Sequence, residues 1–389
     1  METNRQETIP QGYKATALGV IPQEWEILDF DEIVEKSKDR YTPNPDTHLY
    51  CIELEHLSQG EGTLIGYTDS AEQKSTKNRF QKGDVLFGKL RPYLQKYWLA
   101  TFDGVCSTEI WVFHAMPNIC LKEYLFQVIS SYNFIQQANV SSGSKMPRAE
   151  WDYVSKIPIL VPPLGEQRKI AEVLGVWDLA IAKQVQLVER LTERKRALMQ
   201  RLLTAKLRLP GFSTPWKKVK LGDVAELYQP QTIQSEDLLQ TGYPVYGANG
   251  FIGYYSSYNH EHSQVVITCR GSSCGAVNFT PEKCWITGNA MVLNVDNNRD
   301  VNKSFFYYLI SNSSFINLIS GSGQPQIVRR PLLKFELHIP PLDEQTAIAE
   351  VLTAADREIE LAQAKLELYR RQKRGLMQQL LTGKKRIKF

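Results

Sequence analysis

The sequence predicts two tandem globular units of the α+β or α/β class and two long helices that pack as an antiparallel coiled coil with pseudo-two-fold symmetry. Three observations support this prediction: an internal repeat, an apolar seam at heptad spacing in both copies, and alternating strand and helix patterns ahead of each copy. The chain of 389 residues suits two domains with connecting elements, and its 42% hydrophobic and 23% charged residues are typical of a folded protein.

The internal repeat lies 178 residues apart along the chain. Residues 162–174 read PPLGEQRKIAEVL and residues 340–352 read PPLDEQTAIAEVL; over 162–204 the two copies share 21 of 43 positions. Each half also opens alike, around Trp25 and Trp216, whereas residues 40–130 and 230–305 have little in common. The chain is therefore a duplication in which a variable globular unit precedes a constant tail, twice.

The constant tail carries the helix signal. Positions 170, 174, 177, 181, 184, 188, 191, 195, 198 and 202 hold eight apolar residues out of ten, and the same positions of the second copy hold nine. This heptad seam follows a Pro-Pro pair that cannot lie inside a helix, and it predicts a helix over about 165–204, roughly 60 Å long. Such a helix must pair, and its twin is the obvious partner, with the globular units then at opposite ends of a rod.

Lys195 and Lys373 interrupt the seam at equivalent places, and we expect their head groups to extend to water. One alternative stays open: the helix pair could serve only to stabilise each unit, although this does not explain why the tails match while the units diverge.

We expect seven segments along the chain. In order, they are a flexible N-terminus over 1–20, a first recognition unit over 21–160, a central helix over 161–205, a linker over 206–212, a second recognition unit over 213–338, a C-terminal helix over 339–383 and a basic tail over 384–389. Strands are expected in DVLFGKL and QVVITCR, and helices near 122–138 and 303–318.

Composition excludes several classes of protein. The polar start lacks the apolar core of a secretion signal, and no apolar run approaches the roughly 18 residues that cross a bilayer. We therefore expect the protein to be cytoplasmic and not to associate with a membrane. The six cysteines lack a common zinc-ligand spacing. Adenine-methyltransferase and phosphate-loop motifs are absent from the sequence, so we expect no catalysis and no cofactor in this chain.

The similarity between the two halves of the chain, high in the tails and low in the globular units, suggests a mechanism. A surface duplicated almost unchanged suits one partner bound twice, and a surface duplicated but rewritten suits two different ligands. The basic runs 190–208 and 370–388 could be solvated helix faces or surfaces for phosphate or a partner. A rigid spacer between two different readers fits DNA, whose major groove returns to one face about every 34–36 Å.

The chain resembles the DNA-specificity subunits of type I restriction–modification enzymes. The resemblance rests on the two repeated lines, on KGDVLFGKLRPYL (82–94), on YPVYGANGFIGYY (243–255) with VVITCRGSSCGAV (265–277), and on SGSKMPR and SGSGQPQI ahead of each tail. It implies two target-recognition domains, each reading one half of an asymmetric, interrupted sequence in double-stranded DNA. It also implies helices that set the gap and dock two modification subunits. Those partners would carry S-adenosylmethionine, and separate restriction subunits would use ATP and Mg²⁺.

Basic and aromatic residues interleave in the first unit, where we expect contacts to DNA. The expected residues are Lys89, Arg91, Tyr93 and Lys96 around Pro92, and Ser144, Lys145 and Arg148 in the Gly-Ser loop. For Tyr93 and Trp98 a place in the core is an equal alternative.

The second unit offers a different set. The expected DNA contacts are Tyr246 and Asn249 in a glycine turn, Arg270, Ser272 and Ser273 between glycines, and Gln324 and Gln326 in the second Gly-Ser loop. Asn249 could also be an ordinary turn residue. Because Gln326 stands where the first unit has Arg148, we hypothesise that this exchange changes the half-site that is read.

A coiled-coil scaffold with two protein-binding domains is the alternative from another functional class. Salt-sensitive binding to duplex DNA distinguishes the two, since a scaffold that binds only protein would lack it.

Overall fold

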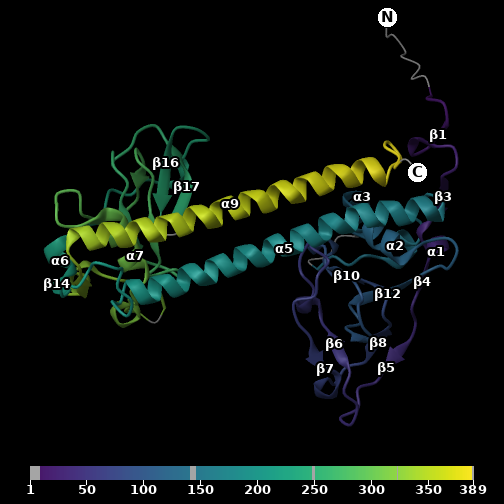
Figure 1. Cartoon of the computed structure of the whole chain (residues 1–389), viewed down its shortest axis with the longest axis horizontal. Helices are drawn as coiled ribbons and strands as arrows, with labels where there is room; N and C mark the ends of the chain where they lie inside the picture. The colour runs from purple at the N-terminus through teal and green to yellow at the C-terminus, as the bar shows by residue number, and fades with distance from the viewer. Residues whose placement is uncertain (1–8, 141–145, 248–249, 322, 388–389) are drawn as a thin grey trace, which may run out of the picture. The chain divides into compact units, whose positions relative to one another are not determined.

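The computed structural model describes residues 9–140, 146–247, 250–321 and 323–387, and they form two compact units (Figure 1). Unit 1 comprises Met1–Gln186 and Gln363–Phe389, and unit 2 comprises Leu187–Ala362. Each unit thus contains one half of each long helix. Residues 1–8 of the expected N-terminal segment lie outside the described residues.

Unit 1 contains a four-stranded antiparallel sheet and a five-stranded mixed sheet. The first has the order β10 (Tyr97–Leu99), β9 (Val85–Gly88), β12 (Ile110–Ala115), β4 (Val34–Lys36). The second has the order β5 (Arg40–Tyr41), β8 (Lys77–Phe80), β11 (Gly104–Cys106), β6 (Tyr50–Ile52), β7 (Thr68–Asp69), with β11 and β6 parallel. Two antiparallel pairs complete the strands: the hairpin of β1 (Tyr13–Thr16) with β2 (Gly19–Pro22), and β3 (Glu26–Asp29) with β13 (Pro158–Val161), which are distant in the sequence.

Unit 2 repeats this order with fewer strands. Its four-stranded sheet runs β19 (Val277–Phe279), β18 (Val265–Thr268), β21 (Ala290–Asn294), β15 (Glu226–Tyr228). A three-stranded sheet runs β17 (Gly250–Tyr255), β16 (Tyr243–Gly247), β20 (Trp285–Ile286), with β16 and β20 parallel. Strands β14 (Lys217–Lys220) and β22 (Glu336–Ile339) pair as β3 and β13 do in unit 1. The two units therefore share one topology although their sequences diverge here.

Short helices close each core. They are α1 (Phe30–Ile33), α2 (Lys122–Ile129), α3 (Tyr132–Ala138) and α4 (Trp151–Val154) in unit 1, and α6 (Leu221–Val224), α7 (Lys303–Ser311) and α8 (Arg329–Leu333) in unit 2. The expected helices near 122–138 and 303–318 are confirmed over most of their length. Strands β9 and β18 also confirm the strand predictions for DVLFGKL and QVVITCR.

The two long helices, α5 (Leu164–Leu202) and α9 (Leu342–Leu380), pack together as the sequence predicted. In unit 1 the early part of α5 lies beside the late part of α9, where Trp177 packs edge-on against Tyr369 at 5.8 Å between ring centroids (Figure 1). All twenty predicted seam positions are buried or half-buried. The helix ends also enter the cores: Ile170, Leu174 and Leu380 in unit 1, and Leu202 and Leu352 in unit 2. The antiparallel pairing is thus confirmed.

The expectation that the two seam lysines extend to water is wrong. In unit 1 the ammonium of Lys373 pairs with Asp178, and in unit 2 Lys195 pairs with Asp356. Lys373 is only 9% exposed. Each ammonium meets a carboxylate that lies one position from the seam on the facing helix, so it forms an ion pair there instead of extending to water. The two pairs are equivalent, because 178 residues separate Asp178 from Asp356 and Lys195 from Lys373.

A glutamate at the start of each long helix forms a buried joint. Glu166, 1% exposed, accepts a 2.9 Å hydrogen bond from the Trp25 indole and a pair of bonds from Arg386, which lies beyond the end of α9. These hydrogen bonds to Glu166 and to Glu24 raise the pKa of Arg386.

Unit 2 repeats the joint with the equivalent residues. Glu344, also 1% exposed, accepts from Trp216 at 3.3 Å and from Arg208, which lies beyond the end of α5. In each unit the joint ties the start of one long helix to the tail of the other.

The glutamine that follows each glutamate fixes the neighbouring domain helix. The Gln167 amide oxygen accepts from the Leu121 backbone N–H at the start of α2, and its nitrogen donates to the carbonyls of Ile119 and Pro162. Gln345 makes the same three bonds in unit 2, to Asn302, Asp300 and Pro340. The Glu-Gln pair that both copies of the repeat share is therefore a buried polar connection.

We expect Glu166→Gln to lower the free energy of unfolding of unit 1 by about 2 kcal/mol. The amide still accepts from Trp25, but the substitution removes the buried one of the two carboxylates that pair with Arg386. The remaining pair with Glu24 and the partial exposure of Arg386 keep the loss below that of a fully buried pair. Urea denaturation followed by tryptophan fluorescence measures it. Glu358→Gln, which removes the exposed pair with Arg194, is the control and should change stability by less than about 1 kcal/mol. Equal effects of the two substitutions would contradict the claim that the buried Glu166 contacts stabilise unit 1.

Candidate nucleic-acid interface

Three loop segments of unit 1 are joined by backbone hydrogen bonds where β9 ends. The Lys89 N–H donates to the Glu109 carbonyl at 2.9 Å, the Ala149 N–H donates to the Lys89 carbonyl at 2.8 Å, and the Arg91 N–H donates to the Pro147 carbonyl at 2.8 Å. Leu90 and Arg148 therefore face each other as an isolated antiparallel bridge. The segment after the strand, the turn before β12 and residues 147–149 are thus fixed side by side.

Unit 2 forms the same arrangement with different residues. The Cys269 N–H donates to the Asn289 carbonyl at 3.1 Å, the Ile327 N–H to the Cys269 carbonyl at 3.0 Å, and the Gly271 N–H to the Pro325 carbonyl at 3.1 Å. Arg270 and Gln326 form the isolated bridge. We name this arrangement the loop-bridge motif: residues 89–91, 109 and 147–149 in unit 1, and 269–271, 289 and 325–327 in unit 2.

The side chains of the motif differ at every equivalent position except Pro147 and Pro325. Arg270 replaces Leu90, Asn289 replaces Glu109 and Gln326 replaces Arg148. The isolated bridge of each motif therefore contains one arginine, but on opposite sides: Arg148 in unit 1 and Arg270 in unit 2. Arg148, Arg270, Asn289 and Gln326 are exposed, and Leu90 and Glu109 are partly exposed. In unit 1 the Arg148 guanidinium pairs with the Glu109 carboxylate at 3.0 Å. A shared backbone thus carries two different sets of polar groups.

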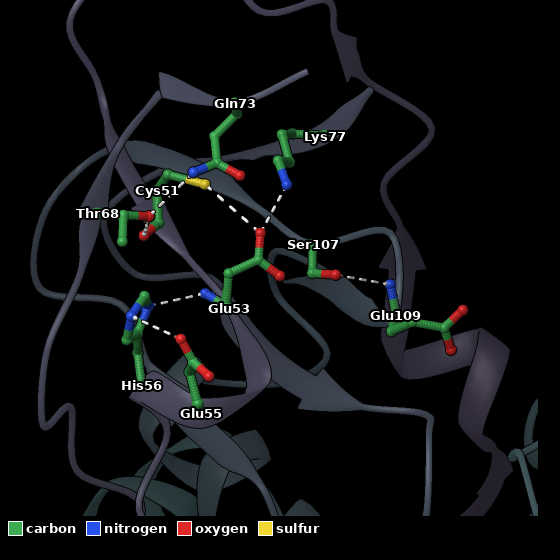
Figure 2. A network of polar contacts seen from close by, with 9 residues as sticks. All are labelled: Cys51, Glu53, Glu55, His56, Thr68, Gln73, Lys77, Ser107 and Glu109. Carbon is green, nitrogen blue, oxygen red and sulfur yellow. Dashed lines mark hydrogen bonds and ion pairs between the residues drawn. The ribbon is translucent and has the colours of Figure 1, made fainter. Parts of the chain in front are cut away.

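A polar network lies beside the turn that carries Glu109 (Figure 2). The Ser107 hydroxyl accepts from the Glu109 N–H at 3.4 Å, and the Ser107 N–H donates to the Ile52 carbonyl at 2.9 Å. Close by, Lys77, nearly buried, pairs with Glu53 at 2.6 Å. Figure 2 shows the Glu109 carboxylate pointing away from this network, so the turn is fixed from within while the carboxylate faces outward.

The segment after β9 turns sharply. Arg91 (φ 52°) and Gln95 (φ 53°) adopt the left-handed conformation on either side of a single 3-10 turn, Pro92–Leu94. Gly88 allows this segment to approach its neighbours, because a Cβ there would lie 2.8 Å from Leu54 Cδ2 and 3.0 Å from Lys96 Cβ. Tyr93 is 46% exposed on this turn. The sequence KGDVLFGKLRPYL thus encodes a strand, a close approach and a surface turn.

Comparison with known proteins identifies the family. The sequence profile of the type I restriction modification DNA specificity domain matches twice, at residues 22–192 and 213–368. The chain belongs to this family.

Individual relatives agree with the assignment, one over nearly its full length and one over less than half. The chain is 26% identical to the MjaX type I restriction enzyme specificity subunit of Methanocaldococcus jannaschii, over 97% of both chains. It is 28% identical to the EcoDI specificity subunit of Escherichia coli, over 44% of this chain and 40% of that one.

Solved structures share the fold. One is a type I restriction–modification system S subunit from M. genitalium, with a TM-score of 0.62 and 15% identity, covering 92% of this chain and 96% of that one. Another comes from work on complex assembly and conformational transition of a type I system, with a TM-score of 0.59 and 21% identity, covering 93% of this chain and 99% of that one. The family match and the specificity-subunit relatives, rather than the fold alone, set aside the coiled-coil scaffold of protein-binding domains in favour of a DNA-specificity subunit.

Apart from Lys96, the predicted DNA contacts of this specificity subunit fall into three groups. Lys89, Arg91, Arg148, Arg270 and Gln326 belong to the loop-bridge motifs. Tyr93, Ser272, Ser273 and Gln324 lie beside the motifs in sequence and are at least partly exposed, whereas Tyr246 is half-buried on β16. Ser144, Lys145 and Asn249 lie outside the described residues.

Two aromatic predictions resolve differently. Trp98 is 5% exposed and packs against Phe80 and Phe102, so the core alternative holds for it. Tyr93 is exposed and stays a predicted contact. Glu109 and Asn289 were missed by the sequence analysis, because only the folded chain brings the start of β12 and β21 between the two loops.

A cationic segment was also missed. Lys36, Lys38 and Arg40 lie in EKSKDR (35–40), where β4 leads into β5. Their spacing in the sequence is a signal that could have been used. No helix in the described part of the chain has the length and apolar character needed to cross a bilayer.

Lys96 has a structural contact besides its predicted role. Its ammonium donates to the carbonyl of Leu57, a fully buried residue of the neighbouring loop. We expect Lys96→Met to lower the free energy of unfolding by about 1–2 kcal/mol, because the carbonyl loses its partner. Thermal and urea denaturation measure this loss. The exposed Lys82→Met serves as the control and should leave stability unchanged; an unchanged stability of Lys96→Met would show that the contact contributes nothing.

Proposed function

We propose that residues 21–160 and 213–338 are two separate readers of DNA, each recognising one half of an asymmetric, interrupted sequence. The observation that carries this proposal is the loop-bridge motif, which occurs twice with one backbone and two sets of side chains. A shared backbone accounts for a shared mode of docking. The rewritten side chains account for two different half-sites.

The chemistry of the exchanged residues suits base recognition. Arginine pairs with guanine in the major groove, asparagine and glutamine pair with adenine, and glutamate accepts from cytosine. Arg148 and Glu109 in unit 1 and Arg270, Asn289 and Gln326 in unit 2 belong to these residue types. The hydroxyl-rich and cationic neighbours of each motif suit phosphate contacts, which position the protein without reading sequence.

The long helices serve a second purpose in this proposal. They set the gap between the half-sites and dock two modification subunits, which supply S-adenosylmethionine and the methylation chemistry. Restriction subunits would join the same assembly with ATP and Mg²⁺. This chain itself would be non-catalytic, bind no cofactor and work in the cytoplasm, where its DNA lies.

Exposed apolar residues on α5 support docking. Val176 is 67% exposed and Leu179 is 57% exposed, one helical turn apart in unit 1 and outside the seam. Adjacent exposed apolar side chains on a polar helix face are typical of a protein contact.

We expect Arg148→Gln to relax the methylated sequence in one half-site and to leave the other unchanged. A single well-placed contact discriminates against a wrong base by about 1–3 kcal/mol, roughly fivefold to 150-fold. The matched substitution Gln326→Ala in the second unit should affect the other half-site only. Mapping of methylated adenines in cells that also express the modification subunits measures both.

Arg299→Gln is the control for this experiment, because Arg299 is exposed in unit 2 and lies away from the loop-bridge motif in sequence. It should leave the methylated sequence intact. The proposal for these two positions fails if both the methylated sequence and the affinity for DNA are unchanged in Arg148→Gln and Gln326→Ala.

We expect the double substitution Val176→Lys and Leu179→Lys to weaken binding of one of the two modification subunits, the one that docks on α5, by at least tenfold while duplex binding by this chain persists. The charges would have to be desolvated in the contact. Co-purification and sedimentation of the complex measure this. Lys183→Gln, an exposed polar position on the same helix, is the control. Unimpaired assembly of the double variant would place the docking surface elsewhere.

A further inference from the structure

A pocket of about 190 Å³ lies in unit 1 beside the loop-bridge motif. Four cationic side chains line it: Lys36, Lys38, Arg40 and Lys89. Thr108, the neighbour of Glu109, and Trp111 on β12 complete the side nearest the motif. The pocket therefore adjoins the segment that we assign to DNA, and four of its nine lining residues, including three of the four cations, come from Lys36–Arg40 between β4 and β5.

The fold fixes the cations in place. The Lys36 ammonium lies 4.3 Å from the centroid of the Trp151 ring and 5.6 Å from that of Trp111, so two aromatic faces hold its side chain. The Arg40 guanidinium donates to the Asn78 side-chain oxygen, and the Asn78 nitrogen donates to the Ile110 carbonyl at 2.8 Å. Asn78 is only 8% exposed, which makes it a rigid support for Arg40.

The positive charge of the pocket is poorly compensated. In the part of the chain that the structure describes, no carboxylate lies within ion-pair distance of the four cations. Burial lowers the pKa of Lys36, and the like charges of Lys89, Lys38 and Arg40 lower it further, while Asp152 partly offsets them. Four cations converging on one pocket favour a bound anion.

The fold itself does not require these cations. Lys36 pairs with Phe113 across the sheet, and in unit 2 the equivalent partner of Leu293 is Leu227, which is 1% exposed. Cys269, buried, stands where Lys89 stands in unit 1. The same topology is therefore built in unit 2 with apolar side chains at both positions.

We propose that this pocket binds one phosphate group, and that its source is the backbone of the DNA read by unit 1. The assignment of the source rests on the proposed function, whereas the binding of a phosphate group rests on the pocket alone. Cations with a nearby hydroxyl are the groups that proteins use for backbone phosphates. Such a contact adds affinity without sequence information, and it makes unit 1 the more salt-sensitive half of the molecule.

The test compares Lys36→Met and Lys38→Gln with wild type. Methionine keeps the aliphatic contact of Lys36 with the tryptophans. Lys38 is exposed, so Lys38→Gln should fold normally and tests the pocket even if Lys36→Met does not fold. Duplex affinity is measured against salt concentration, with a cognate duplex and with one whose half-sites are scrambled. Lys122→Gln, a half-exposed lysine at the start of α2, is the control.

Loss of the phosphate contact should lower the salt slope by about 1 and reduce affinity about threefold to tenfold on both duplexes, with the methylated sequence unchanged. The control should match wild type. A slope and affinity that match wild type in both variants would overturn the DNA backbone as the source.

Inorganic phosphate at constant ionic strength distinguishes the sources. Inorganic phosphate should raise the melting temperature of wild type but not of Lys36→Met, and this result supports a pocket for a phosphate group. If the salt dependence of duplex binding is nevertheless the same in the variants and wild type, the source of that group is a free phosphate. Absence of both effects overturns the inference. A wild-type chain that shows no salt-dependent or sequence-specific binding would instead contradict the proposed function, while leaving the inorganic-phosphate result interpretable.

Discussion

The structure depends on one buried ion pair, formed twice. Glu166 and Glu344 are each 1% exposed, and each accepts hydrogen bonds from a tryptophan indole and from an arginine that lies beyond the end of the opposite helix. A buried carboxylate is costly unless it is paired and hydrogen-bonded, so the joint strongly constrains where the two helices meet. The glutamate and glutamine of the repeated line PPL-x-EQ reflect this constraint, because a change at either would leave its buried hydrogen-bonding partners unpaired.

The joint connects the long helices, whose sequence is shared by the two copies of the repeat, to the globular units, whose sequences differ. Beyond it, each unit keeps its strand order and the backbone bonds of the loop-bridge motif, while the side chains that face outward change. A specificity subunit needs this division, since recognition can change only if assembly does not. The same division explains how the basic pocket in unit 1 can have apolar counterparts in unit 2 without altering the fold.

The sequence predicted the helices well and the polar contacts poorly. Heptad periodicity determines the α5–α9 seam, because burial of an apolar face depends on local spacing. Lys195 and Lys373 were misjudged, since their partners Asp356 and Asp178 lie on the facing helix and periodicity does not identify pairs. The shared strand order of the two units was out of reach, because residues 40–130 and 230–305 retain little sequence similarity. Glu109 and Asn289 came to attention only through hydrogen bonds between segments distant in the chain.

Mapping of adenine methylation across the genome, with and without this gene, tests the central claim most directly. The account predicts that an asymmetric sequence with two defined halves and an undefined gap is methylated only when the gene is present. Methylation that persists unchanged without the gene, or a methylated sequence with a single uninterrupted half, would contradict the account of two different readers on one constant framework.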